Sequence, residues 1–203
     1  MKKWYLKFIK MKSRVFILLF LILLVSCSES KYAKLVKTEM AKNVVNDSLL
    51  FEMKFGQTRQ DFYDQCWKLN NEKIITHGSS NKFVQYNLPL KESDSSIYAI
   101  KMLFYGIFDK EKIMRGMDMR FSYHAWSLWN ESLHSDKLMP VVKDSLQSWY
   151  PGNDFLPVTI KKTKKNVLVK IDGNRRIIIE PFNNNKDVDV RIDDLRFVLD
   201  KKL

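Results

Sequence analysis

Apolar and polar side chains alternate most clearly over residues 112–124. The apolar side chains occupy every second position, at Met117, Met119, Phe121 and Tyr123. Side chains of a strand point to opposite faces in turn, so this segment is predicted to have one buried and one wet face. A second apolar segment at 97–108 precedes it, and Asp109-Lys110-Glu111 between them suits a turn. We therefore expect a long antiparallel hairpin.

Two other segments show the three-to-four-residue spacing of amphipathic helices. Thr58 can cap the first helix with Asp61 at the capping-box position, and this helix is predicted to end near Leu69. The second helix is predicted to be capped by Asp136 and to stop before Tyr150-Pro151-Gly152. Its residues at helical spacing are Leu138, Val141, Val142, Leu146 and Trp149. We expect the apolar face of each helix to pack on the sheet.

Further short apolar segments are expected to be strands, and Asp172-Gly173-Asn174 gives a strong hairpin signal between two of them. These segments are residues 49–55, 83–88, 158–161, 167–171, 176–180, 188–192 and 195–199. A helix followed by about three strands thus occurs twice along the chain. The predicted fold class is α+β, with an antiparallel sheet that has one buried face packed against two helices, in two helix-then-three-strand units.

The amino-terminal 26 residues have the pattern of an export signal. Residues 1–14 carry six positive charges and no acidic side chain, and residues 15–25 are wholly apolar. Eleven helical residues at about 1.5 Å each reach about half of a roughly 30 Å hydrocarbon core. We therefore expect the apolar segment to be the central region of a signal peptide and not a permanent membrane span.

The signal ends in Leu24-Val25-Ser26-Cys27, which resembles the lipobox of bacterial lipoproteins. The resemblance implies that the Cys27 thiol accepts diacylglycerol, that cleavage follows Ser26, and that the new amino group of Cys27 is acylated too. One acyl chain binds a membrane only marginally, whereas two or three hold it stably. The alternative is an ordinary signal peptide with a chance cysteine. The expected partner of the mature chain is the membrane, through lipid on Cys27.

The residues after Cys27 bear on location within the cell envelope. Lipoproteins of this kind with Asp after the cysteine tend to stay in the inner membrane, and this chain has Ser28, so the resemblance favours the outer membrane. Ser28-Glu29-Ser30 contains one acid, which leaves open whether the chain faces the periplasm or the surface. The expected organisation is a signal peptide at 1–26, a lipidated cysteine and tether at 27–48, and one α+β domain at 49–203.

Charge does not indicate a nucleic-acid partner once the signal is removed. The whole chain has a net charge of +12, but the mature chain has 29 basic against 23 acidic groups. The dense basic run is Lys161, Lys162, Lys164 and Lys165, with no aromatic residue among them to stack on a base. A solvated strand end or loop is the expected role of this run, and a surface facing phosphate or lipopolysaccharide is the alternative.

Titratable and thiol side chains do not form a familiar catalytic or metal-binding motif. His77, His124 and His134 lack metal-ligand spacing, so no metal or cofactor is expected. His124 lies near charged residues on the predicted wet face, where acid–base chemistry is the alternative to an exposed strand of mixed charge. Cys66 is the one cysteine besides Cys27, so no intramolecular disulfide is expected, and its helix position indicates a core residue.

Trp126 and Trp129 form the densest aromatic cluster of the sequence. They are the candidate ligand-binding residues, because exposed indoles stack on sugars and anchor protein interfaces. The alternative is that they close one edge of the core.

The layout also resembles the helix-plus-meander envelope lipoproteins of the barrel-assembly type and the β-lactamase-inhibitor-protein fold, with Phe55-Gly56-Gln57-Thr58 opening the first helix. The chain has a second helix and more strands than the barrel-assembly lipoprotein, so no partner or contact residue is carried over. We expect a membrane-anchored envelope lipoprotein that docks a protein partner and is not an enzyme. A module for a small ligand or glycan is one alternative, and a hydrolase with an unrecognised site is another.

Overall fold

The computed structural model describes residues 29–78, 83–90, 95–160, 163–181 and 184–200. The chain divides into two parts, Met1–Leu35 and Val36–Leu203, and the fold below is that of the second part. The predicted signal peptide and lipidated Cys27 lie outside the described residues, as do Lys161 and Lys162 of the basic run.

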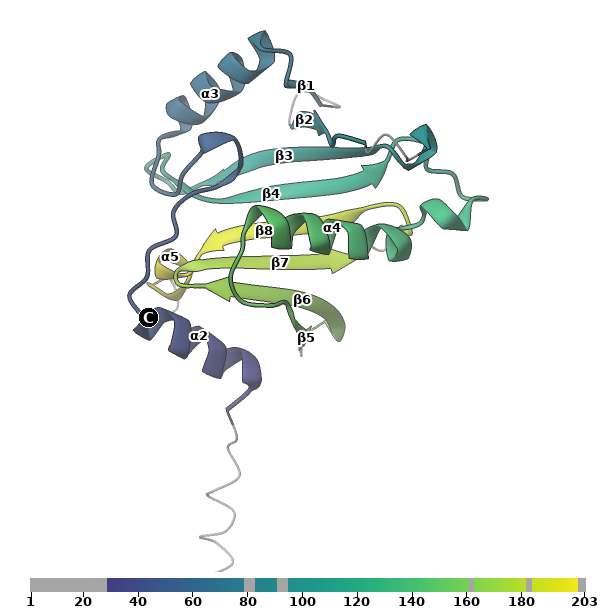
Figure 1. The fold of residues 1–203 in the computed structure, drawn as a ribbon. Coiled ribbons are helices and arrows are strands. Elements are labelled where there is room, and N and C mark those ends of the chain that lie inside the picture. The colour runs from purple at the N-terminus through teal and green to yellow at the C-terminus, as the bar shows by residue number, and fades with distance from the viewer. Residues whose placement is uncertain (1–28, 79–82, 91–94, 161–162, 182–183, 201–203) are drawn as a thin grey trace, which may run out of the picture. The chain divides into compact units, whose positions relative to one another are not determined.

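The described residues form one antiparallel sheet with the strand order β1-β2-β3-β4-β8-β7-β6-β5 (Figure 1). Its strands are β1 (Ile75–His77), β2 (Val84–Asn87), β3 (Ile100–Phe108), β4 (Met114–Tyr123), β5 (Leu156–Ile160), β6 (Lys165–Asp172), β7 (Arg175–Pro181) and β8 (Val188–Asp194). The predicted α+β class with an antiparallel sheet is confirmed. The sequence does not predict β1, whose three residues are too few to give an alternation pattern.

Four α-helices accompany the sheet in the described part of the chain. They are α2 (Lys31–Ala41), α3 (Arg59–Asn71), α4 (Ser135–Trp149) and α5 (Leu195–Asp200). The described residues also include 3-10 turns at η1 (Leu50–Glu52), η3 (Ser96–Tyr98) and η4 (Glu131–Leu133). None of the helices described is long and apolar enough to cross a bilayer.

The caps of α3 and α4 test the predicted helix starts. Thr58 accepts a hydrogen bond from the Asp61 amide at 3.1 Å, and the Asp61 carboxylate accepts one from the Thr58 amide at 2.8 Å. The predicted capping box of α3 is confirmed. For α4 the prediction is wrong by two residues, because His134 is the cap and Asp136 lies in the first turn, where its negative charge suits the helix dipole.

The main core lies between α4 and the centre of the sheet. Helix α4 contacts β4, β7 and β8 and lies across β8 and β7 in Figure 1. Its inward side chains are fully buried, as are the alternating apolar residues of β4 and β8 beneath them. These residues are Leu138, Val142 and Leu146 of α4, Met117, Met119 and Phe121 of β4, and Val188, Val190 and Ile192 of β8.

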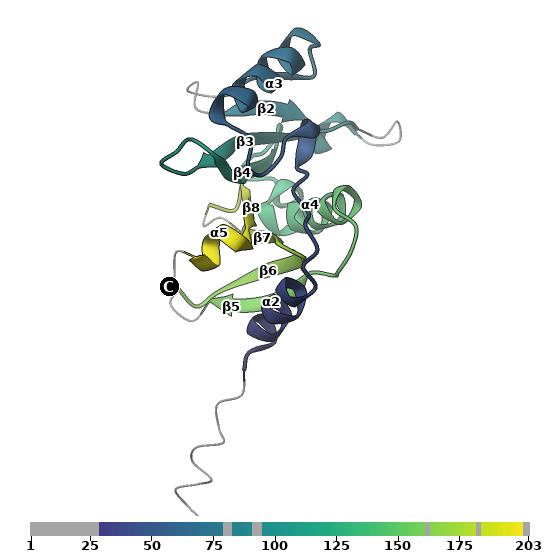
Figure 2. The same cartoon turned by 90° about the vertical axis from the view of Figure 1, so that its left-hand side faces the viewer.

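Two predicted strands are wrong. Residues 195–199 form α5, because the Asp194 carboxylate accepts the Arg196 amide at 3.0 Å and so begins a helix where β8 ends. Figure 2 shows α5 and α4 on opposite faces of the sheet. Residues 49–55 contain the η1 turn, in which Phe51 has a φ of 57° and its ring lies 5.3 Å from that of Phe104.

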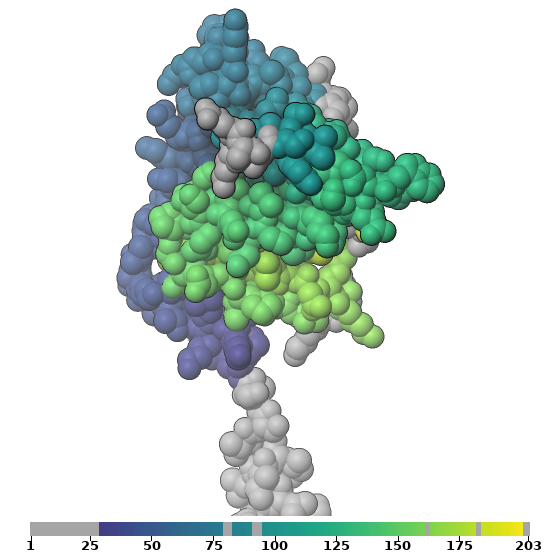
Figure 3. All heavy atoms as spheres, turned by 45° about the vertical axis from the view of Figure 1, so that its right-hand side comes forward, coloured from purple at the N-terminus to yellow at the C-terminus, as the bar shows by residue number. Residues whose placement is uncertain are grey.

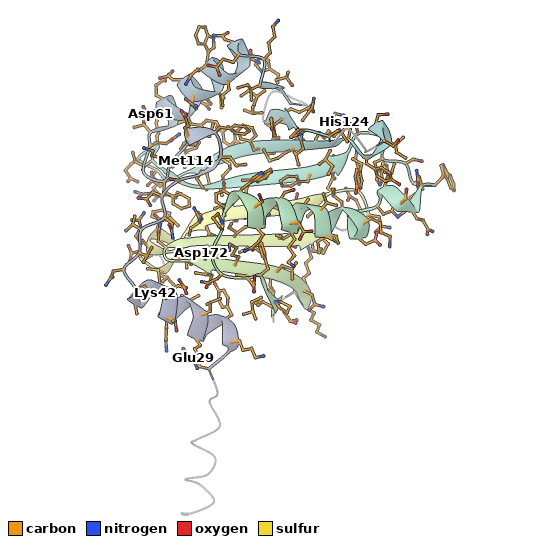
Figure 4. The ribbon with its side chains drawn as sticks, viewed as in Figure 1. Glu29, Lys42, Asp61, Met114, His124 and Asp172 are labelled. Atoms are coloured by element: carbon orange, nitrogen blue, oxygen red, sulfur yellow. The ribbon has the colours of Figure 1, made fainter. Side chains whose placement is uncertain are left out.

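A dense hydrogen-bonded contact joins residues 39–48 to the turn between β6 and β7, and we call it the amino-terminal clamp. The Gly173 amide donates to the Glu39 carboxylate at 3.2 Å. The Asn46 amide donates to Asn174 Oδ1 at 2.6 Å, and the Asn46 side chain donates to the Asp172 carbonyl at 3.0 Å. Figure 4 labels Lys42 and Asp172 at the same end of the sheet.

Gly173 is required at this turn for two reasons. Its φ is 57°, a conformation that side chains disfavour, and an added Cβ would lie 2.2 Å from the Val44 carbonyl oxygen. The turn is also held from the other side, since the Asn153 amide donates to the Asp172 carboxylate at 2.7 Å. Fully buried Lys170 donates to the Asn153 carbonyl and lies 3.2 Å from the same carboxylate. The tether expected over 27–48 is therefore bonded to the sheet from Glu39 onward.

Replacing Asn174 with Ala is expected to lower the free energy of unfolding by about 1–3 kcal/mol, because buried Asp194 and half-buried Asn46 and Asp47 each lose a hydrogen bond. Urea denaturation followed by circular dichroism measures the change. The matched control is Asn71→Ala at an exposed position on α3, for which a change of about 0.5 kcal/mol or less is expected. Equal effects of the two substitutions would show that the clamp does not stabilise the fold.

Candidate functional site

The face of the sheet opposite α4 carries an ordered set of charges, which we call the charge ladder. Because Met117 and Met119 point toward α4, Asp118 and Arg120 point the other way. The register places Asp118 opposite Arg191 and Arg120 opposite Asp189 on the neighbouring strand β8. Two pairs of opposite charge therefore lie side by side. In one pair the acid is on β4 and the base on β8, and in the other pair the order is reversed.

Both pairs of the charge ladder are bidentate. Arg120 donates to the Asp189 carboxylate at 2.7 and 3.3 Å, and Arg191 donates to that of Asp118 at 2.7 and 3.0 Å. These hydrogen bonds raise the pKa of both guanidinium groups above the usual range. The side chains are between 33% and 56% exposed, so solvent screens the pairs and each contributes about 0–1 kcal/mol to stability. Their main effect is to hold four charges in fixed positions.

A cavity of about 390 Å³ lies over the charge ladder. Its lining includes both ion pairs and three apolar side chains from other parts of the sheet, namely Phe83, Ile160 and Ile178. Two more ion pairs join neighbouring strands of the sheet, β6 to β7 between Lys165 and Glu180 at 2.5 Å and β7 to β8 between Arg176 and Asp193 at 2.6 Å. The cavity thus combines fixed charges of both signs with apolar walls.

A second cavity of about 260 Å³ lies between α3 and strands β1 to β3, and we call it the aromatic pocket. Tyr63, Trp67, Phe83 and Tyr105 contribute rings to its lining. The hydroxyls of Tyr63 and Tyr105 are hydrogen-bonded at 3.0 Å, while Trp67 is 72% exposed at the rim. Burial and the Tyr63 hydrogen bond raise the pKa of Tyr105, so its hydroxyl stays protonated at neutral pH. Phe83 lines both cavities, so they adjoin, and we call the pair the groove.

Cys66 lies in the wall of the aromatic pocket, half-buried beside fully buried Phe62. Burial raises the pKa of its thiol to about 12, so almost no thiolate is present at neutral pH. The side chain therefore acts as an apolar part of the wall. The sequence indicates its helix face correctly, but the structure adds that one side of the thiol faces a cavity.

His124 does not join the charges that neighbour it in sequence. Its Nε2 lies 3.0 Å from Asn87 Oδ1, whereas Asp118 and Arg120 are paired with residues of β8. Burial and the nearby Lys101 lower the pKa of the imidazole, which is therefore mostly neutral at pH 7. Among the described residues, no group of three or more His, Cys, Asp or Glu side chains is arranged to hold a metal ion.

The predicted ligand residues Trp126 and Trp129 have different environments. Trp126 is half-buried against the core, donates its indole N–H to the Asn185 carbonyl at 3.3 Å, and lies under the Lys186 ammonium group. Trp129 is 89% exposed. The two cavities of the groove are lined by other described residues. The proposed pairing of the two indoles in one site stays a prediction.

Sequence reasoning missed the groove because its parts come together only through long-range pairing. The alternation pattern places Asp118 and Arg120 on the wet face, but Arg120 and Asp189 are 69 positions apart in the chain. The aromatic pocket depends on β1, which the sequence does not predict, and on Phe83 at the edge of β2. The local signal available was the exposed Tyr63 and Trp67, four positions apart on α3.

Comparisons with protein-family models, curated proteins and solved structures found no significant match to this chain. The functional argument therefore rests on the groove, its charges and the amino-terminal pattern.

The Cys66 thiol is expected to react slowly with a disulfide reagent in the folded protein. Because burial holds its pKa near 12, the rate should rise about tenfold per pH unit from pH 7 to 10 without levelling off. An exposed thiol would instead approach a plateau near pH 9. Absorbance of the released reagent measures the rate, with the urea-unfolded chain as control. A plateau below pH 10 in the folded protein would contradict the buried thiol.

Proposed function

We propose that this chain is an envelope lipoprotein, held to the membrane by lipid on Cys27, whose α+β domain docks a protein partner in the groove. The observation that carries the docking role is the aromatic pocket adjoining the charge ladder through Phe83. The anchor rests on the lipobox resemblance, and the proposal keeps the outer membrane as the favoured location.

The proposal includes a finer arrangement of the fold. Helices α3 and α4 belong to two helix-and-strand units. Contacts of α3 with β1 and β3, and of α4 with β4, β7 and β8, support this grouping. The charge ladder then lies on the face opposite α4, and α3 forms one wall of the aromatic pocket beside it.

The chemistry of the groove favours a polypeptide over a neutral sugar. The four charges of the ladder satisfy one another in pairs, and burying them under an uncharged ligand would remove water that no new partner replaces. A polypeptide segment supplies charges of both signs and an apolar side chain that can fill the aromatic pocket. We therefore expect a segment with one apolar anchor residue beside alternating charges.

The aromatic pocket supports a second candidate function, the binding of a small apolar ligand. Its volume of about 260 Å³ is slightly below the range of about 300–1,000 Å³ for small-molecule sites. A small ligand would use the pocket alone, so the charge ladder separates the two candidates.

An exchange of charges tests docking directly. The double variant Asp118→Arg and Arg191→Asp keeps an ion pair at the same place but reverses its polarity. A photo-reactive side chain at the Trp67 position is expected to cross-link one partner in living cells, and the exchange should reduce the adduct at least about tenfold. Stability should change by about 1 kcal/mol or less, because the pair is exposed.

The control is the same photo-reactive side chain at Val141, which is exposed on α4 across the sheet. Equal adducts from the two positions, or adducts that survive the exchange unchanged, would contradict docking in the groove. Survival of a small-molecule adduct at Trp67 would instead support the ligand-binding candidate.

The anchor has a separate test in the Cys27→Ser variant. Without the thiol there is no acceptor for diacylglycerol, so the chain should remain an uncut precursor without label from radioactive palmitate. Gel mobility and autoradiography of immunoprecipitated protein measure both properties. A mature, correctly cut Cys27→Ser chain would rule out the lipoprotein assignment and leave the groove argument untouched.

A further inference from the structure

The segment between β4 and α4 carries two large apolar side chains that face solvent. Leu128 is 58% exposed and Trp129 is 89% exposed. Figure 3 shows this green segment as a projection from the surface. The high exposure of both side chains is that of a convex tip and not of a groove. We call Leu128 and Trp129 the apolar tip.

Hydrogen bonds within the segment hold the apolar tip in place. The Trp129 amide donates to Ser127 Oγ at 3.3 Å, and the Leu128 carbonyl lies 3.3 Å from His134 Nε2. Asn130 accepts from the Ser132 amide at 3.2 Å and from its hydroxyl at 2.7 Å. At its base the segment is fixed by the buried side chain of Leu133.

These internal hydrogen bonds lower the cost of moving the apolar tip from water into a membrane interface. Backbone groups that enter a membrane interface need partners inside the protein, and the Trp129 amide and the Leu128 carbonyl already have them. Trp is enriched at membrane–water interfaces, because its ring is apolar and its N–H stays near water. A convex apolar tip also fits a bilayer, which deforms around it.

The amino-terminal clamp limits how far the domain can move from an anchor on Cys27. Residues 28–38 are the eleven that separate Cys27 from Glu39, the first clamped residue. Residues 31–38 belong to helix α2 and span about 12 Å at roughly 1.5 Å each, and residues 28–30 add at most about 11 Å when extended. A domain of this size has a radius of gyration of about 15 Å, so its diameter of about 40 Å exceeds this reach. Residues 28–38 are therefore few enough to hold the surface of the domain against the bilayer.

We propose that Leu128 and Trp129 insert into the phospholipid interface as a second, reversible membrane contact. This inference rests on the lipid anchor of the proposed function and not on the groove. Two side chains alone bind weakly, but a lipid anchor supplies a high local concentration of membrane. Glu131 follows the tip closely, so the contact depends on apolar insertion and not on anionic lipid.

The test uses the purified chain reconstituted in phosphatidylcholine vesicles with or without brominated acyl chains. Subtracting the emission of the Trp129→Phe variant from that of the wild type isolates Trp129. Brominated lipid should reduce this emission about twofold or more, with a shift to shorter wavelength, because the ring lies at the interface. High salt or replacement of some lipid by phosphatidylglycerol should leave the quenching unchanged.

Trp67→Phe gives the matched control, because Trp67 is also largely exposed but lies on α3. Its emission should not respond to brominated lipid. If Trp129 keeps the emission of a water-exposed indole in vesicles, or if Trp67 is quenched equally, the inference is overturned. Flotation of the vesicles reports on the anchor separately, so a chain that floats with unquenched Trp129 refutes only the insertion.

Discussion

The register between β4 and β8 determines both faces of the sheet. The same pairing that sets Met119 against Val190 beneath α4 sets Arg120 against Asp189 on the other face. Because the side-chain period of a strand is two, a slip by one residue would send apolar side chains into water and the charges into the core. The apolar face therefore enforces the register, and the charge ladder follows from it at little cost. The groove is in this sense a by-product of the core.

The amino-terminal clamp shows the opposite balance, because polar groups there replace apolar contacts. Asn174, Asp194 and Lys170 are buried, and each polar group named in the clamp meets a partner of complementary chemistry. Such a network adds little net stability when complete, since desolvation offsets most of each bond, but it is costly when one member is lost. The network instead specifies conformation, because its hydrogen bonds hold residues 39–48 in one path across the β6–β7 turn.

Local rules predicted the elements that local chemistry controls. The capping box of Thr58 and Asp61, the alternation of β4 and the hairpin at Gly173 each depend on a few adjacent residues, and each is present in the structure. Residues 195–199 failed because a short apolar segment suits a strand or a helix, and one carboxylate, Asp194, decides between them. The groove was beyond prediction because it needs pairing across about seventy residues. The clamp was missed for the same reason, since Asn46 meets a residue 128 positions away.

The clamp also sets where tension would enter the fold. A pull on the amino terminus reaches the sheet at Glu39 and is passed to the β6–β7 turn through the bonds of Asn46 and Asn174. The strands that continue from that turn share the load while these bonds hold. Release of residues 39–48 would add about 35 Å of chain while leaving the strands paired. Residues 39–48 are thus a reserve of length that a pull on the amino terminus can draw out before the sheet unfolds.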